Sequence, residues 1–152
     1  MHSVRAHVTF EAAHRLHDDG VYSKKCQTCL HGHSYGVTVY LSSPRLLDCG
    51  MVIDFTQLKE ILRSVIVEPF DHSCILKKTD PLCMPVSMYC ENVHIVDENP
   101  TAEWMAHEFY LRIQSAIASK LADTPPQVKV TRVEVQETAN NIAIFEVGHE
   151  DF

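Results

Sequence analysis

Residues 4–14 read VRAHVTFEAAH, and apolar side chains occupy every second position of this stretch. The apolar members of one parity are Val4, Ala6, Val8, Phe10 and Ala12. Successive side chains of a strand point to opposite faces, so the period of two predicts a strand with one buried face. His14 has the same parity and is expected at the end of that face.

The same alternation returns after a polar loop that we expect over residues 18–30. The apolar positions of this second strand are Tyr35, Val37, Val39 and Leu41. Extended backward, their parity runs through His33 and His31, so both imidazoles are expected on one face. A short strand near residues 51–53 is expected to pair in a hairpin.

Two amphipathic helices are predicted next. Asp54 opens the first as an N-cap, apolar residues then recur at i, i+3 and i+4 spacing, and Pro69 is expected to end it. Thr101 is the predicted N-cap of the second, which Pro125-Pro126 closes. The segment between them, residues 71–88, is expected to be irregular, with a strand near residues 92–96.

Two last strands follow, joined by a turn at residues 138–141. Val133, Val135 and Glu137 occupy alternate positions of the first of these strands, so their side chains are expected on the same face. The order of elements predicts an α+β domain, in which antiparallel hairpins carry two helices on one face. We see no repeat and no linker, and therefore expect one domain over residues 1–152.

Composition excludes several classes of protein. The 152 residues are 45% hydrophobic and 22% charged, which is typical of a soluble globular domain. The net charge of −7 argues against nonspecific nucleic-acid binding. No apolar run approaches the ~20 residues that span a bilayer, and the N-terminus lacks the apolar block of a signal peptide. We therefore expect no membrane partner and a cytoplasmic location, where the six cysteines are thiols.

Three histidines form a candidate metal site. His31 and His33 lie two residues apart on one face of their strand, and His14 ends the buried face of the other. If these strands pair, three imidazoles converge at one end of the sheet. Three neutral imidazoles with one open coordination position are typical of catalytic zinc.

A competing interpretation uses the nearby cysteines. Cys26 and Cys29 precede the two histidines as Cys-x2-Cys-x-His-x-His, which could form a closed structural zinc site. The protein would then be a non-catalytic module stabilised by zinc. Its ligands are spaced more tightly than in the usual zinc knuckle.

Other residues suggest proton transfer and ligand binding. Lysines flank Cys26, and a nearby cation or metal lowers a thiol pKa, so a thiolate here could act as a base. Asp71 and His72 could form a proton relay. Glu137, on the apolar parity, is a carboxylate that needs hydrogen-bond donors, and a 2-amino-4-oxo pterin edge offers two adjacent ones.

Six segments in order resemble the 6-pyruvoyl-tetrahydropterin synthases and their relatives, the 6-carboxytetrahydropterin synthases of the queuosine pathway. The segments are FEAAHRL (residues 10–16), Cys26 through HGHSY (residues 31–35), MVIDF (residues 51–55), Asp71-His72, NPTAE (residues 99–103) and ETANN (residues 137–141). The resemblance covers nearly the whole sequence.

The resemblance implies the tunnelling fold, in which subunits join their sheets into trimeric barrels that stack as a homohexamer with sites between subunits. It also implies that His14, His31 and His33 bind zinc and that Asp71 and His72 are a catalytic pair. Glu137 would anchor the pterin with help from Thr101 and Glu103.

One departure concerns the catalytic cysteine. In the two branches of the family, three or five residues separate the catalytic cysteine from the histidines, as Cys-x3-His-Gly-His or Cys-x5-His-Gly-His. In this sequence four residues separate Cys26 from His31, and one residue separates Cys29 from His31. We favour Cys26, because it lies between the two family spacings. The departure leaves both the base and the product, pyruvoyl or carboxy, open.

The resemblance implies 7,8-dihydroneopterin triphosphate as the substrate, a small-molecule pterin that loses its triphosphate in a lyase reaction. Mg²⁺ could accompany the triphosphate. Another enzyme of the same fold, an aldolase or a cyclohydrolase acting on pterins, is the enzymatic alternative.

Overall fold

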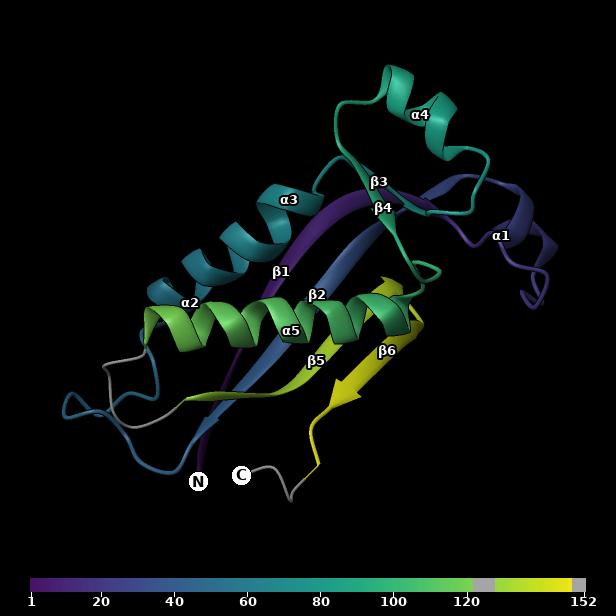
Figure 1. Cartoon of the computed structure of the whole chain (residues 1–152). Helices are drawn as coiled ribbons and strands as arrows, with labels where there is room; N and C mark the ends of the chain where they lie inside the picture. Colours follow the sequence, from purple (N-terminus) through teal and green to yellow (C-terminus); the bar gives the residue numbers. More distant parts are fainter. Residues whose placement is uncertain (122–127, 149–152) are drawn as a thin grey trace.

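The computed structural model describes residues 1–121 and 128–148 of the protein. Six strands form one sheet in the order β4-β3-β1-β2-β5-β6. Figure 1 shows helices α2 and α5 lying over the same face of this sheet. The predicted α+β class is therefore confirmed.

Four strands form the antiparallel part of the sheet. They are β1 (His2–Arg15), β2 (His31–Ser43), β5 (Lys129–Thr138) and β6 (Asn141–Glu146). β1 and β2 pair along their whole length, from His2 opposite Ser43 to His14 opposite His31. The predicted alternation is confirmed, because Phe10 and Tyr35 are buried on the face that carries His14.

Of the remaining two strands, β4 confirms the strand expected near residues 92–96, whereas β3 and a helix correct the prediction that residues 71–88 are irregular. β3 (Ser73–Lys77) pairs in parallel with β1, β4 (Val93–Val96) pairs in parallel with β3, and α4 (Cys83–Tyr89) connects them. The sheet is therefore mixed rather than purely antiparallel. Four of the five β3 residues are buried, so the strand shows no alternation by which its sequence could be recognised.

Two further expectations are wrong. Residues 51–53 form no strand; the Leu47 amide donates to the Met51 carbonyl in a turn, and Val52 and Ile53 pack into the core. The expected loop at residues 18–30 contains the short helix α1 (Lys24–Thr28).

Both predicted helix starts are confirmed. Asp54 caps α2 (Phe55–Leu62) by accepting from the Thr56 amide at 2.7 Å. That helix continues through the π-helical turn η1 (Arg63–Val67) into α3 (Glu68–Phe70), so Pro69 lies in its last turn. Thr101 caps α5 (Ala102–Lys120), its hydroxyl accepting from the Trp104 amide at 3.2 Å. Pro125-Pro126 lies outside the described residues.

The core fills the space between the sheet and these helices. Phe10 stacks on Tyr35 at 5.1 Å between ring centroids and meets Phe109 of α5 edge-on at 5.8 Å. Burying each such ring stabilises the fold by about 1.5–3 kcal/mol. The apolar face of β1 ends at His14, which places the polar site directly beyond a rigid core. None of the helices in the described part of the protein is long and apolar enough to cross a membrane.

Candidate metal centre and ligand cavity

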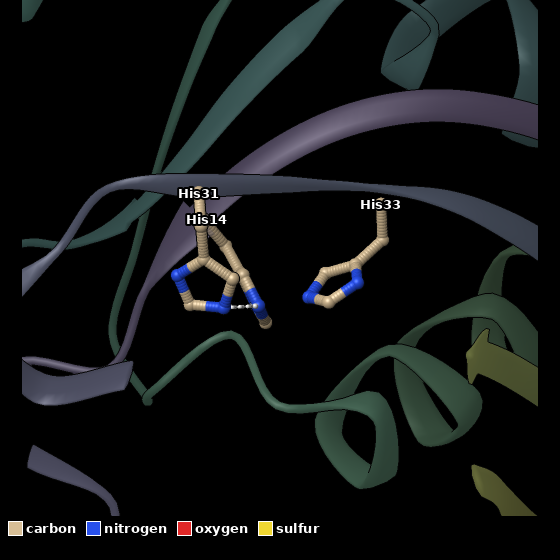
Figure 2. A group of neighbouring side chains, drawn as sticks. All are labelled: His14, His31 and His33. Atoms are coloured by element: carbon tan, nitrogen blue, oxygen red, sulfur yellow. Dashed lines mark hydrogen bonds between the residues drawn. The ribbon is translucent and has the colours of Figure 1, made fainter. Parts of the chain in front are cut away.

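The pairing of β1 with β2 brings three histidines together. His14 and His31 are direct cross-strand partners, and His33 lies two residues further along the same face of β2. Their candidate ligand atoms all lie within 4.8 Å of one another. Figure 2 shows the three rings gathered on one side of the two strands.

Backbone carbonyls fix the orientation of two of these rings. His14 Nδ1 donates to the Pro100 carbonyl at 2.7 Å, and His31 Nδ1 donates to the Cys29 carbonyl at 2.9 Å. A carbonyl oxygen only accepts, so in a neutral ring the proton is on Nδ1 and Nε2 carries a lone pair. The two Nε2 atoms face each other at 3.2 Å, and a hydrogen bond between them requires a second proton on one ring.

Burial disfavours that second proton on His14. The His14 ring is 1% exposed, and burial lowers its pKa to about 4, with smaller contributions from the neighbouring His31 and His33. Burial also lowers the pKa of His33, and the charge of Glu137 opposes this shift. Neutral imidazoles are the form that ligates a metal ion.

The donor set fits zinc. Among the described residues, His33 Nε2 is buried without a hydrogen-bond partner, and the lone pairs of His14 and His31 point at each other. A divalent cation bound between the three nitrogens would satisfy all of them. Carbonyl partners on Nδ1 are the usual outer contacts of zinc-bound histidine.

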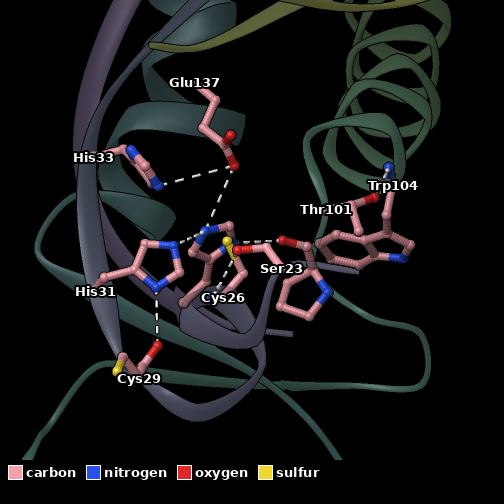
Figure 3. A network of polar contacts seen from close by, with 10 residues as sticks. Ser23, Cys26, Cys29, His31, His33, Thr101, Trp104 and Glu137 are labelled. Atoms are coloured by element: carbon pink, nitrogen blue, oxygen red, sulfur yellow. Dashed lines mark hydrogen bonds and ion pairs between the residues drawn. The ribbon is translucent and has the colours of Figure 1, made fainter. Parts of the chain in front are cut away.

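The alternative closed zinc site receives no support from the geometry. The group of potential ligands found among the described residues contains the three histidines and neither cysteine. Cys29 is exposed, and Figure 3 shows its sulfur directed away from the rings. It is the Cys29 backbone, not its thiol, that contacts His31.

A cavity of about 550 Å³ lies beside the histidines. All three residues that the family resemblance assigns to the pterin line this cavity. The full lining is Leu16, Thr101, Ala102, Glu103, Glu137, Asn140, Asn141, Ile142 and Ala143. This volume is in the range of about 300–1,000 Å³ that small-molecule sites occupy.

Glu137 faces both the cavity and the histidines. Its Oε1 lies 3.5 Å from His14 Nε2 and 3.9 Å from His33 Nε2 (Figure 3). The ladder between β5 and β6 shifts register between Gln136 and Thr138, so Glu137 sits at a bulge. Bulges of this kind re-aim side chains next to binding sites.

Cys26 is held close to this cavity by its backbone. The carbonyl oxygen of Cys26 accepts from the Leu16 amide at 3.0 Å, and Leu16 lines the cavity. The Cys26 side chain is half-buried, whereas that of Cys29 is exposed. Of the two candidate bases, Cys26 therefore has the better position.

Asp71 and His72 lie elsewhere. His72 Nδ1 contacts Asp71 Oδ2 at 2.8 Å, and the His72 side chain is 82% exposed. It lines a second hollow of about 400 Å³ together with Glu11, Ser34 and the candidate metal ligand His33. Glu137 does not line this hollow. His72 also has a left-handed backbone with φ of 56°, an unusual conformation for a residue other than glycine.

The carbonyl partners of the histidines were not recognisable from the sequence. Pro100 and Cys29 act through backbone oxygens, which every residue carries, so no side-chain pattern identifies them. Asn140 and Asn141 belong to the predicted turn and to the ETANN segment, which gives them no role in binding, but both line the cavity.

Comparison with known proteins points to one family. Residues 3–147 match the family described as 6-pyruvoyl tetrahydropterin synthase. The protein is 31% identical over 135 residues to a protein of Rickettsia bellii named 6-carboxy-5,6,7,8-tetrahydropterin synthase, covering 88% of this sequence and 91% of that one. A protein of the same name from Aquifex aeolicus is 32% identical over 152 residues, covering 90% and 92%.

A solved structure shares the fold. The 6-pyruvoyl tetrahydropterin synthase of Caenorhabditis elegans superposes with a TM-score of 0.66 at 23% identity, covering 96% of this protein and 95% of that one. The family match, the two relatives and the shared architecture agree with one another, and this protein belongs to the 6-pyruvoyl tetrahydropterin synthase family.

Proposed function

We propose that this protein is a zinc-dependent lyase that converts 7,8-dihydroneopterin triphosphate, with loss of triphosphate, into 6-carboxy-5,6,7,8-tetrahydropterin. The observation that carries this proposal is a single carboxylate, Glu137, which contacts two of three converging imidazoles and lines a cavity of about 550 Å³. The names of the relatives favour the carboxy product. The family resemblance implies a place in queuosine biosynthesis. 6-Pyruvoyl-tetrahydropterin is the second candidate product.

In the proposed complex, different groups of the protein bind the pterin ring and the side chain of the substrate. Glu137 accepts two adjacent N–H groups of the pterin edge, and Thr101 and Glu103 line the same cavity at the start of α5. Held by His14, His31 and His33, zinc would supply a Lewis acid beside the hydroxyls of the substrate. Fixing the ring in this way orients the reacting carbon.

Cys26 is the proposed base. Its backbone is tied to Leu16 in the cavity wall, so a thiolate on this half-buried residue can remove a carbon-bound proton from the substrate tail. Triphosphate leaves from the neighbouring carbon. Mg²⁺ would accompany the triphosphate as a counter-ion rather than as a ligand of these residues.

Asp71 and His72 enter the site from another subunit in this proposal. His72 is highly exposed and lines a hollow away from Glu137 in its own subunit, which supports a role toward a neighbouring copy. The exposed Ile142 and Ile144 on the edge strand β6 support continuation of the sheet into that copy. The proposed assembly is a homohexamer of two trimeric barrels.

The test is incubation of the zinc-loaded protein with 7,8-dihydroneopterin triphosphate, followed by mass analysis of the products. Release of triphosphate with 6-carboxytetrahydropterin and acetaldehyde supports the proposal. Formation of 6-pyruvoyl-tetrahydropterin would instead assign the protein to the pyruvoyl-forming branch of the family. Cleavage of the side chain with the triphosphate still attached to the released fragment indicates an aldolase instead. No turnover of this substrate, with release of formate from GTP in a parallel incubation, indicates a cyclohydrolase.

Chelation tests the non-catalytic alternative. A module stabilised by zinc unfolds when a chelator removes the ion. The hydrophobic core between the sheet and the helices is built from apolar residues other than the three histidines. We therefore expect chelation to abolish turnover and leave the far-UV circular dichroism intact.

A further inference from the structure

Glu137 has a second relationship that pterin binding does not explain. Its Oε1 lies 3.5 Å from His14 Nε2 and 3.9 Å from His33 Nε2, while His14 Nε2 lies 3.2 Å from His31 Nε2. Four atoms from three strands, β1, β2 and β5, therefore converge on one small volume.

The carboxylate contact with His14 is not a hydrogen bond between neutral His14 and ionised Glu137. The proton of neutral His14 is on Nδ1, where it is donated to Pro100, so Nε2 has none to give. The carboxylate oxygen has none either. Two acceptors facing each other repel, unless a cation lies between them.

Two of the separations match those between the ligands of one tetrahedral ion, and the three histidine nitrogens as a set lie within 4.8 Å of one another. Bonds of about 2.0–2.1 Å to nitrogen or oxygen place neighbouring ligand atoms about 3.3 Å apart. The contacts of 3.2 Å and 3.5 Å are close to this value, and the contact of 3.9 Å is within reach of a small side-chain movement.

The backbone at Glu137 permits such a movement. The pairs Gln136–Ile142 and Thr138–Asn141 bracket the bulge, so Glu137 itself has no partner in the ladder with β6. Its side chain is 25% exposed and faces the cavity. One carboxylate can therefore reach either the histidine nitrogens or a ligand in the cavity.

We propose that Glu137 is the fourth ligand of the metal ion in the substrate-free enzyme and leaves it when the pterin ring binds. This inference rests on the proposed function and deepens it. The N–H groups of the pterin compete with the ion for the same oxygens, so arrival of the ring frees a coordination position. The Lewis acid then becomes available only when substrate is in place.

Cobalt substitution tests this exchange, because the visible spectrum of bound Co²⁺ reports the number and type of its ligands. The variant is Glu137→Gln, and the matched control is Glu103→Gln, which removes one charge from the same cavity. We expect the control to keep the wild-type spectrum and Glu137→Gln to change it. Chelator competition should show Co²⁺ binding to Glu137→Gln weakened by about tenfold or more.

The second arm uses 6-methyl-7,8-dihydropterin, which has the ring but no hydroxylated tail to ligate the metal. Added to the wild-type Co²⁺ protein, it should shift the spectrum toward that of Glu137→Gln. An unchanged spectrum on adding saturating pterin overturns the exchange.

The outcomes separate this inference from the proposed function. If Glu137→Gln binds Co²⁺ with the wild-type spectrum and affinity, Glu137 is not a ligand, while the three-histidine site stands. If Glu103→Gln shows the same change as Glu137→Gln, the effect is one of cavity charge and the inference fails. If wild-type protein binds no Co²⁺ at all, both proposals fail.

Discussion

His14 and Pro100 are joined by a hydrogen bond of 2.7 Å from the imidazole Nδ1 to the backbone carbonyl oxygen. Pro100 directly precedes Thr101, which caps α5 and lines the cavity. The same short segment thus orients a candidate metal ligand and forms part of the candidate pterin site. Displacement of the start of α5 is expected to disturb both.

Removal of His31 should remove the metal. In His31→Ala we expect zinc affinity to fall by at least about tenfold and turnover to be lost with it, because two imidazoles form an incomplete site. The matched control is His7→Ala, since His7 is also on the β1–β2 sheet but is exposed and contacts Thr38. Zinc content after dialysis, measured by elemental analysis, checks this; stoichiometric zinc in His31→Ala contradicts the site.

Cys26 should be required for chemistry but not for metal binding. Cys26→Ala is expected to lower kcat by about 10²–10⁴-fold, the usual contribution of a general base, and to keep its zinc. Cys29→Ala should retain most activity, because the Cys29 thiol points away from the histidines (Figure 3). The reverse result for the two variants would assign the base to Cys29.

Two inactive variants should complement each other if sites are shared between subunits. Co-expressed His31→Ala and His72→Ala subunits are expected to recover about a quarter of the wild-type turnover, from random pairing of the two kinds of subunit. Co-expressed His31→Ala and His14→Ala subunits should recover none, because both lack the same half of the site. Absence of recovery in the first pair would place Asp71 and His72 outside a shared site.

The buried pair of Arg15 and Asp80 should contribute strongly to stability. Arg15 Nε donates to Asp80 Oδ2 at 2.7 Å, and the Asp80 side chain is fully buried. Asp80→Asn leaves the guanidinium charge uncompensated, and we expect a loss of about 3–5 kcal/mol in the free energy of unfolding.

The control for that variant is Asp97→Asn, which breaks the exposed pair of Asp97 with Lys78 at 2.7 Å. Exposed pairs are worth about 0–1 kcal/mol, so this change should be nearly silent. Urea unfolding of both variants measures the difference. If both variants lost the same free energy of unfolding, burial would not be the reason that the Arg15–Asp80 pair stabilises the fold.

Asp71 should titrate below its ordinary pKa of 3.8, because its carboxylate accepts first from the Glu11 amide and then from His72. The folded state favours the charged form, so this stabilisation is present above about pH 4 and is lost as the pH falls through the lowered pKa. Carboxyl NMR titration should show that His72→Ala raises the pKa of Asp71 only partway. Full return to 3.8 would make His72, not the amide, the main cause.

The local elements followed from the sequence where periodicity was strong. The alternation in β1 and β2 identified the buried face and put His14, His31 and His33 on it, and the caps Asp54 and Thr101 marked both helix starts. β3 was missed because its residues are buried on both faces and so do not alternate. The hairpin near residues 51–53 was wrong because Val52 and Ile53 enter the core from a turn instead.

The sequence by itself determined which residue types and which face the site uses, because side-chain parity is a property of the local backbone. Only the tertiary structure decided which atoms meet. Cross-strand register set His14 opposite His31, and a bulge lies at Glu137, which faces both the rings and the cavity. Parallel pairing of β3 with β1 placed His72 in a second hollow, which it shares with His33 and not with Glu137. These relationships depend on contacts between residues far apart in sequence and on backbone carbonyls, neither of which leaves a local pattern.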